Sequence, residues 1–333
     1  MGSLRSIALV LISACAVEAD PALSPDDGFD DTVDDGKADA SNASVGTVHR
    51  FTDRKLYPEG GAFDPATGAF FVGSLGHGNI TRVSPEGTES VFYAGAGETA
   101  RLTLGMQIDA TRNRLWVCTT KDSLGSLWIF DLASGARTAN IDLTVANPEA
   151  ACNDVLLDTD GSALVSDREN HHIYRVDAAG AVRVWADDPL LGGAVVSLNS
   201  MDFTADRKYV LTATYLEPAL VRVSVANPRE VKKVALSGDM FMDGFNLLNG
   251  PDDLVMHGND LIVAFGSSIK RITPSDASWT QAKVRSTRTI GGVTALVEDD
   301  DRLFAINGQS VRFALKVPPA QFQIFEVDTR ALR

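Results

Sequence analysis

The chain repeats one pattern of short apolar runs along most of its length. In each copy a first run is followed by a turn and then by a second run of aliphatic and aromatic residues. The first runs end at Asp64, Asp109, Asp158, Thr204, His257 and Glu298. These positions are 45, 49, 46, 53 and 41 residues apart, and strand pairs with such a period are typical of the blades of a β-propeller. The sequence therefore predicts an all-β fold, a six-bladed β-propeller.

The two ends of the repeated region predict how the ring closes. The last copy has room for a third strand at 322–327, and only 328–333 follow it. A strand-like run at 47–51 precedes the first copy and belongs to no blade of its own. We expect this N-terminal strand to complete the last blade, because closing the ring hides sheet edges that would otherwise pair with other chains.

The start of the chain is typical of an exported protein. Arg5 precedes the apolar run 7–12, which is far shorter than the roughly 20 residues that span a bilayer. The run leads into Ile12-Ser13-Ala14-Cys15, which resembles the lipobox of bacterial lipoproteins. We expect residues 1–15 to be a signal peptide ending at a lipidated Cys15, with a secretory peptide cleaved after Ala19 as the alternative. The protein is then lipid-anchored at the bacterial cell envelope.

The next segment and the overall charge limit the partners. Residues 16–45 contain nine acids and one base and few apolar side chains, so we expect a disordered acidic linker. The propeller then occupies residues 46–333. The net charge of −14 argues against a nucleic-acid partner, because phosphate binding needs a basic surface. We expect a monomer that meets the membrane only through its N-terminal lipid.

Four oxygen-bearing side chains occur at one phase of the repeat. They precede the end of the first run of their copies by five residues each, and they are Glu59, Asn153, Asn199 and Asp252. The first strand of a propeller blade lines the central channel, so equal offsets place these side chains at one level of it. Two carboxylates and two amide oxygens suit a hard divalent cation such as Ca²⁺ or Mg²⁺. Asn and Asp also terminate strands and form turns, which is the structural alternative.

The same residues resemble the SMP-30/gluconolactonase/LRE-like family of six-bladed propellers, whose metal centre is similar to that of the diisopropylfluorophosphatases. The resemblance covers about residues 50–330 and rests on Pro58-Glu59-Gly60, Asn153-Asp154, Asn199 and Pro251-Asp252. It implies one divalent metal held by Glu59, Asn153, Asn199 and Asp252. Calcium is the metal implied, with Mg²⁺, Mn²⁺ or Zn²⁺ as alternatives. It also implies hydrolysis of lactones or related esters.

The chain departs from this family at three positions. Ser200 and Asp253 stand where glycine is usual, and Ala151 stands where members that act on sugar lactones often carry arginine. The resemblance therefore implies an intact metal centre without the group that would hold the hydroxyls of a sugar.

The implied metal and Asp252 predict a hydrolytic mechanism, with a non-catalytic role as the alternative. The metal would stabilise the oxyanion formed from a small-molecule lactone or ester, and Asp252 would act as general base or as nucleophile. The alternative is a non-catalytic, envelope-anchored propeller that binds a protein or glycan partner and holds a structural calcium. Apolar residues in the loops 95–103, 188–197 and 238–250 suit a hydrophobic substrate or a partner protein.

Other candidate residues are weaker. The five histidines lack metal-ligand spacing, and we expect His171 and His172 to lie in a solvent-exposed loop. Cys118 and Cys152 can pair after export, but the sequence does not place them within the distance that a disulfide needs, so their pairing stays open. The tryptophans are expected to pack between blades. Further candidates for the channel mouth are Gln107, Asp122 and Asp167.

Overall fold

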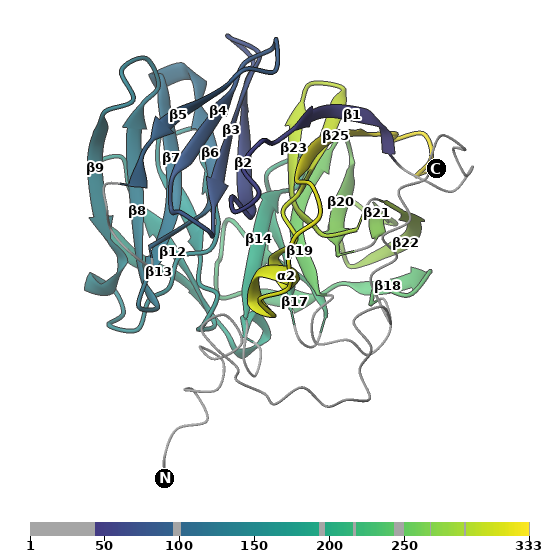
Figure 1. Ribbon diagram of the computed structural model, residues 1–333. Helices are drawn as coiled ribbons and strands as arrows, with labels where there is room; N and C mark the ends of the chain where they lie inside the picture. The colour runs from purple at the N-terminus through teal and green to yellow at the C-terminus, as the bar shows by residue number, and fades with distance from the viewer. Residues whose placement is uncertain are drawn as a thin grey trace.

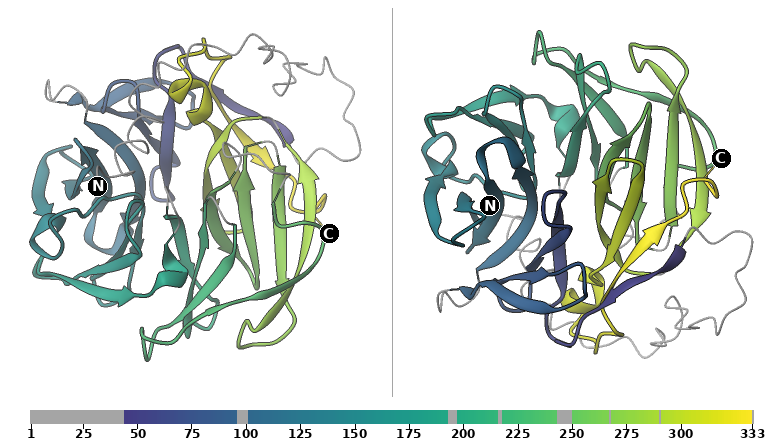
Figure 2. Two further views of the ribbon diagram at one scale, coloured as in Figure 1. Left: turned by 90° about the horizontal axis from the view of Figure 1, so that it is seen from below. Right: turned by 90° about the horizontal axis from the view of Figure 1, so that it is seen from above.

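Six sheets are arranged around one central axis (Figures 1 and 2). The computed structural model describes residues 44–95, 101–192, 197–215, 218–242, 250–266, 268–289 and 291–332. The expected signal peptide and nearly all of the expected linker lie outside these residues. The arrangement confirms the prediction of a six-bladed β-propeller.

The first three blades are antiparallel sheets of four strands each, numbered outward from the axis. Blade 1 contains β2 (Pro58–Asp64), β3 (Ala69–Ser74), β4 (Ile80–Val83) and β5 (Glu89–Tyr93). Blade 2 contains β6 (Leu102–Asp109), β7 (Arg114–Lys121), β8 (Leu124–Asp131) and β9 (Arg137–Asp142). Blade 3 contains β10 (Val155–Leu157), β11 (Ala163–Ser166), β12 (His172–Val176) and β13 (Val182–Asp187). The first apolar run of each copy is thus the innermost strand.

The last three blades follow the same plan with one addition. Blade 4 contains β14 (Leu198–Phe203), β15 (Tyr209–Thr214), β16 (Leu220–Ser224) and β17 (Val231–Lys233). Blade 5 contains β19 (Pro251–His257), β20 (Asp260–Phe265), β21 (Ser268–Pro274) and β22 (Gln281–Arg288), with β18 (Ala235–Gly238) added parallel to β22 at its outer edge. Blade 6 contains β23 (Val293–Asp299), β24 (Arg302–Asn307) and β25 (Gln323–Val327). The strand β18 was not predicted.

The N-terminal strand closes the ring. β1 (Ser44–Arg50) pairs antiparallel with β25, which gives blade 6 the order β1-β25-β24-β23 (Figure 1). Beyond β1, the amide of Phe51 donates a hydrogen bond of 3.0 Å to the carbonyl of Phe322. This confirms that the two ends of the repeated region share one blade.

Apolar contacts between blades hold the ring together. Among the described residues, the buried apolar side chains form six clusters, one at each contact between neighbouring blades. All residues of the second strands β3 and β20 are buried, because a neighbouring blade covers each face of the sheet. This explains why the apolar runs are continuous rather than alternating. All four tryptophans are buried in these regions, as predicted.

A disulfide joins blades 2 and 3. Cys118 in β7 is bonded to Cys152, which precedes β10, and the Cα atoms are 5.4 Å apart. A cross-link across 34 residues lowers the entropy of the unfolded chain. In the chain-entropy model this raises the free energy of unfolding by about 4 kcal/mol. The bond settles the pairing that the sequence left open, and it fixes the segment that carries Asn153.

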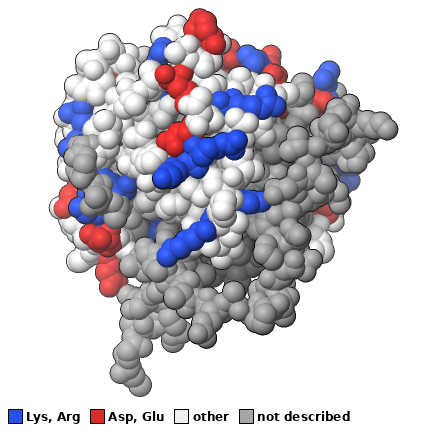
Figure 3. Space-filling model, in the orientation of Figure 1, with Lys and Arg blue, Asp and Glu red and all other residues white. Residues whose placement is uncertain are grey.

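Charged side chains of both signs lie on the surface, and the described helices are short. Acidic and basic side chains are interspersed over the described part of the face in Figure 3. The α-helix α2 (Ser310–Ala314) has five residues, and no helix in the described parts of the chain has the length and apolar character to cross a bilayer.

Polar side chains also connect the inner strands of successive blades. Gln107 in β6 accepts a hydrogen bond of 2.6 Å from the amide of Leu157. Asp202 in β14 accepts one of 2.7 Å from the amide of Met256, and Asp253 in β19 accepts one of 2.6 Å from the amide of Leu296. Burial raises the pKa of Asp202 to about 7.

The raised pKa of Asp202 predicts a pH-dependent stability. Between about pH 4 and pH 7 the folded protein keeps a proton on this carboxyl that the unfolded chain, with a carboxyl pKa near 3.9, has released. The contribution of Asp202 to the free energy of unfolding therefore falls as the pH rises through this window. Relative to the wild type, Asp202→Asn should gain stability from pH 4 to pH 7, measured by urea unfolding at constant calcium. A stability difference independent of pH would contradict the raised pKa.

Candidate metal centre

The four side chains that share one phase of the repeat lie at the same mouth of the channel. Glu59 is in β2, Asn199 in β14 and Asp252 in β19, and each falls where the pairing of the inner strand with the next strand shifts register. Such irregularities turn a side chain away from the regular alternation of a strand. Asn153 comes directly before β10. These local shifts explain why polar side chains at the start of buried strands can point toward the axis.

Glu59 also depends on the glycine that follows it. Gly60 has a φ of +69°, and a Cβ atom there would lie 2.2 Å from the carbonyl oxygen of Leu104. Only glycine fits this close approach of two inner strands without strain. The Pro58-Glu59-Gly60 sequence is therefore a requirement of the backbone that presents the glutamate.

Hydrogen bonds connect three of the four side chains in a row. The amide of Asn153 donates to Oδ1 of Asn199, and Nδ2 of Asn199 donates to Oδ1 of Asp252 at 2.7 Å. The same Nδ2 is 3.3 Å from the carbonyl oxygen of Pro251. Residues separated by about 50 positions in the sequence thus meet at one point, as their spacing in the repeat predicted.

Glu59 completes this group through its charge. Its Oε2 atom is buried and has no hydrogen-bond partner among the residues that the structure describes. Burial raises the pKa of Glu59, and the negative charge of Asp252 raises it further, while the positive charge of Arg168 opposes this. Burial also raises the pKa of Asp252 to about 7. Two half-buried carboxylates, one with a buried oxygen that lacks a partner among the described residues, are costly unless a cation neutralises them.

The donors fit a hard divalent cation. Carboxylate and amide oxygens are the ligands that Ca²⁺ and Mg²⁺ prefer, and the unpartnered oxygen of Glu59 provides a free ligand atom. The residues that would hold the cation are Glu59, Asn153, Asn199 and Asp252.

The sequence reasoning missed three further residues at this mouth. Ser310, at the start of α2, donates a hydrogen bond of 3.4 Å to Oδ2 of Asp252. The charges of Asp252 and Glu59 contribute to the raised pKa of Tyr215, whose largest cause is burial. Arg168 acts on Glu59 electrostatically. All three follow the second strand of a blade, which returns to the mouth where the first strand began, so this position in each repeat was the available signal.

Ser200 and Asp253, which stand where related proteins usually have glycine, lie close to each other next to the candidate ligands. Ser200 Oγ lies 2.8 Å from Oδ2 of Asp154 and also hydrogen-bonds to Asp253. Burial raises the pKa of Asp154 to about 6 and raises the pKa of Asp253, with the charge of Asp154 as the second cause. Buried Ser200 and half-buried Asp253 and Asp154 therefore form one polar cluster.

The segment before β10 is held rigidly. The amide of Gly125 donates a hydrogen bond of 2.8 Å to the carbonyl of Ala150, and the amide of Gly105 donates one of 2.9 Å to the carbonyl of Asn153. Thr120 Oγ1 donates to the carbonyl of Cys152 at 2.9 Å. Ala151 is fully buried within this segment, between two blades.

The remaining candidates for the mouth have other positions. Gln107 bonds to the backbone of blade 3, and Asp167 is fully buried, where it accepts hydrogen bonds from its own loop and from Tyr174. Asp122 is exposed in the turn between β7 and β8. In the loops expected to frame a pocket, Leu191 and Phe241 are buried in the contacts between blades. Parts of these loops lie outside the described residues.

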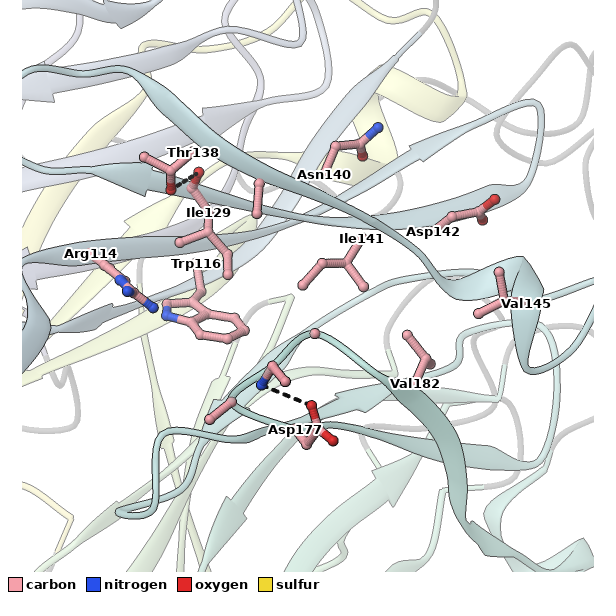
Figure 4. A pocket seen from close by; sticks show the side chains of 14 residues that line it. Arg114, Trp116, Ile129, Thr138, Asn140, Ile141, Asp142, Val145, Asp177 and Val182 are labelled. Atoms are coloured by element: carbon pink, nitrogen blue, oxygen red, sulfur yellow. Dashed lines mark hydrogen bonds between the residues drawn. The ribbon is translucent and has the colours of Figure 1, made fainter.

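A surface pocket of about 480 Å³ lies elsewhere, between blades 2 and 3 (Figure 4). Its polar side chains serve the local backbone: Thr138 donates to the carbonyl of Ile129, and Asp177 accepts from the amides of its own turn. None of the four candidate ligands lines it. We interpret it as a groove between neighbouring blades.

Fold and site together define a six-bladed propeller with a group of buried oxygen donors at one mouth of its channel. The chain belongs to the SMP-30/Gluconolactonase/LRE-like family, whose model matches residues 57–304. No curated protein matches the chain.

Solved structures share the fold at low sequence identity. The chain is similar to the allergen Mala s 1 of Malassezia sympodialis, with a TM-score of 0.66, 17% identity, and coverage of 84% of this chain and 95% of that one. It is similar to the gluconolactonase XC5397 of Xanthomonas campestris, with a TM-score of 0.60, 16% identity, and coverage of 86% and 91%. For the calcium-binding protein regucalcin of Agrobacterium tumefaciens the values are 0.58, 17%, 86% and 95%.

Removing the charge of Glu59 tests its place in the centre. Glu59→Gln keeps the shape of the side chain but removes one of two carboxylates, so calcium affinity measured by isothermal titration calorimetry should fall roughly 10- to 100-fold. Glu86→Gln, at an exposed turn, is the matched control and should bind calcium as the wild type does. Unchanged affinity in Glu59→Gln would show that this carboxylate is not a ligand.

Proposed function

We propose that this protein is a metal-dependent hydrolase of lactones or related esters, with calcium as its metal. The observation that carries the proposal is the row Asn153–Asn199–Asp252 beside the unpartnered carboxylate oxygen of Glu59. Membership of a family named partly for gluconolactonase supports it, as does the shared fold with a gluconolactonase and with regucalcin.

In this proposal Glu59, Asn153, Asn199 and Asp252 hold the cation. When bound, a divalent cation supplies a Lewis acid that polarises a carbonyl and stabilises developing negative charge. Asp252, whose pKa burial raises to about 7, would be kept ionised at neutral pH next to a bound cation, because a nearby positive charge lowers the pKa of a carboxyl.

Asp252 is the proposed general base. Its two oxygens accept hydrogen bonds from Asn199 and Ser310, and these two contacts orient the carboxylate. It removes a proton from water as the water oxygen bonds to the carbonyl carbon of the lactone. The ring C–O bond then breaks, and the alkoxide leaving group takes the proton back from Asp252, which gives the hydroxy acid. Direct attack by the carboxylate is the nucleophilic variant.

Two further polar side chains lie within electrostatic reach of the carboxylates. Arg168 provides a positive charge on the side of Glu59, and Tyr215 provides a hydroxyl close to both carboxylates. Ala151 is fully buried and has no polar side chain with which to bind hydroxyls. We therefore propose lactones or esters with few hydroxyl groups as the preferred substrates.

The test is a hydrolysis screen in which acid release is followed with aliphatic, acylated and sugar lactones. We expect turnover that a chelator abolishes and that added calcium restores. Asp252→Asn should reduce kcat at least about 100-fold, because it removes the base. Asp301→Asn, at an exposed turn, is the matched control and should retain activity.

Two outcomes would contradict metal-dependent hydrolysis at this site. Turnover that survives both the chelator and Asp252→Asn would place the chemistry elsewhere. No turnover on any lactone, with calcium bound, would favour the alternative of an envelope-anchored propeller that binds a protein or glycan partner around a structural calcium.

We also propose that the propeller is displayed at the bacterial cell envelope through lipid on Cys15. The support is the Ile12-Ser13-Ala14-Cys15 sequence after a short apolar run and the acidic segment 16–45 that follows. The disulfide between Cys118 and Cys152 agrees with an oxidising compartment. In a bacterial host, radioactive palmitate should label the wild type and not Cys15→Ser. Equal labelling of both proteins would contradict the anchor.

A further inference from the structure

A second group of metal-binding side chains lies at the outer edge of blade 3, away from the channel axis. His172 begins β12, and its pairing partner Asp187 ends β13 (Figure 1). His171 precedes β12, and its Nδ1 is 2.8 Å from Oδ1 of Asp187. Nε2 of His172 is 3.5 Å from the same oxygen. The prediction that both histidines lie in a solvent-exposed loop is wrong for His172, which belongs to β12 and is half-buried. Its partner Asp187 was not predicted, because sequence spacing does not reveal which residues pair across two strands.

We propose that His171, His172 and Asp187 form a site for a divalent transition-metal ion such as Zn²⁺. One ligand atom from each residue lies within 4.8 Å of the others. Ligands at about 2.0–2.1 Å around a tetrahedral Zn²⁺ are about 3.3 Å apart. Oδ1 of Asp187 lies 2.8 Å from Nδ1 of His171 and 3.5 Å from Nε2 of His172, on either side of that value. Three protein ligands leave the fourth position open to water.

The donor set separates this site from the candidate centre at the channel mouth. Imidazole nitrogens favour Zn²⁺, Co²⁺ or Ni²⁺, whereas the oxygen donors of Glu59, Asn153, Asn199 and Asp252 favour Ca²⁺. The side chains of His171 and Asp187 are 47% and 58% exposed, so an ion can enter directly from solvent. The inference is thus independent of the proposed hydrolysis.

Half-buried Asn147 and buried Tyr174 contact the ring of His172 on the side away from Asp187. Nδ2 of Asn147 is 3.2 Å from Nδ1 of His172, and Oδ1 of Asn147 accepts a hydrogen bond from the amide of Glu149, which fixes the amide orientation. The hydroxyl of Tyr174 is 3.5 Å from the same ring nitrogen and donates to Asp167 at 2.6 Å. Metal ligation by Nε2 places the ring proton on Nδ1, where the Tyr174 oxygen can accept it.

This arrangement predicts a variant that binds metal more tightly. Histidine ligands usually donate their second ring N–H to an acceptor, and a carboxylate in that place strengthens the ligand. Asn147 offers a donor to Nδ1 instead. Asn147→Asp supplies one oxygen for the amide of Glu149 and one for the ring N–H, so it should raise the affinity for Zn²⁺.

A bound ion would fix one loop of the channel mouth. β10 begins at the mouth, β11 returns to it, and the loop from Asp167 to His171 follows β11. That loop carries Arg168, which acts on Glu59. Binding of His171 and Asp187 to one ion ties this loop to the end of β13.

The experiment uses the full chain without a histidine tag, saturated with calcium so that the oxygen centre is filled. We expect one Zn²⁺ per chain by equilibrium dialysis at about pH 7.5, because metal binding to imidazole weakens in acid. Co²⁺ should give the visible absorption bands of an ion with nitrogen ligands. His171→Ala and His172→Ala should each lower the affinity for Zn²⁺ at least about tenfold. Because the side chain of His171 is exposed, His171→Ala is the variant that should leave the fold intact.

His77→Ala is the matched control, because His77 forms a similar pair with Asp53 at 2.9 Å, and within the described part of the chain no third ligand joins that pair. It should bind Zn²⁺ as the wild type does, and so should Glu59→Gln. Zn²⁺ binding that persists in both His171→Ala and His172→Ala would overturn the proposal. An affinity that Asn147→Asp fails to raise would overturn the assignment of Nε2 of His172 as a ligand.

Discussion

Burial of both faces of every blade is the constraint on which this structure depends. A single sheet such as β2–β5 cannot bury its continuous apolar strands alone, and each blade therefore needs a neighbour on each side. Only a closed ring gives every blade two neighbours. The six apolar clusters between blades and the pairing of β1 with β25 are two expressions of that requirement.

The ring brings together residues that are distant in the sequence, and local backbone irregularities turn them toward the axis. Glu59, Asn199 and Asp252 each occupy a register shift at the start of an inner strand. In blades 2 and 6 the same irregularity carries Gly105 and Thr294 instead, so these blades bring no carboxylate to that level. The chemistry of the mouth is thus set by which side chain stands at one structurally repeated position.

The sequence was sufficient for the architecture because the apolar runs recur at a regular period, and the inner strands end within one residue of the expected positions. The same period located the four candidate ligands. It did not reveal Arg168, Tyr215 and Ser310, because they follow second strands and have no residue type in common. The strand β18 and the group around His172 were also missed, and the pairing of Cys118 with Cys152 stayed open, since each depends on which segments come together and not on the repeat.

The disulfide has a consequence for how the protein matures. Cys152 is next to Asn153, so the bond to Cys118 restrains the backbone that presents one candidate ligand. If oxidation of the two thiols favours the geometry that holds a cation, thermodynamic reciprocity requires that a bound cation makes the disulfide harder to reduce by the same factor. Disulfide formation and cation binding are then coupled, and each stabilises the other.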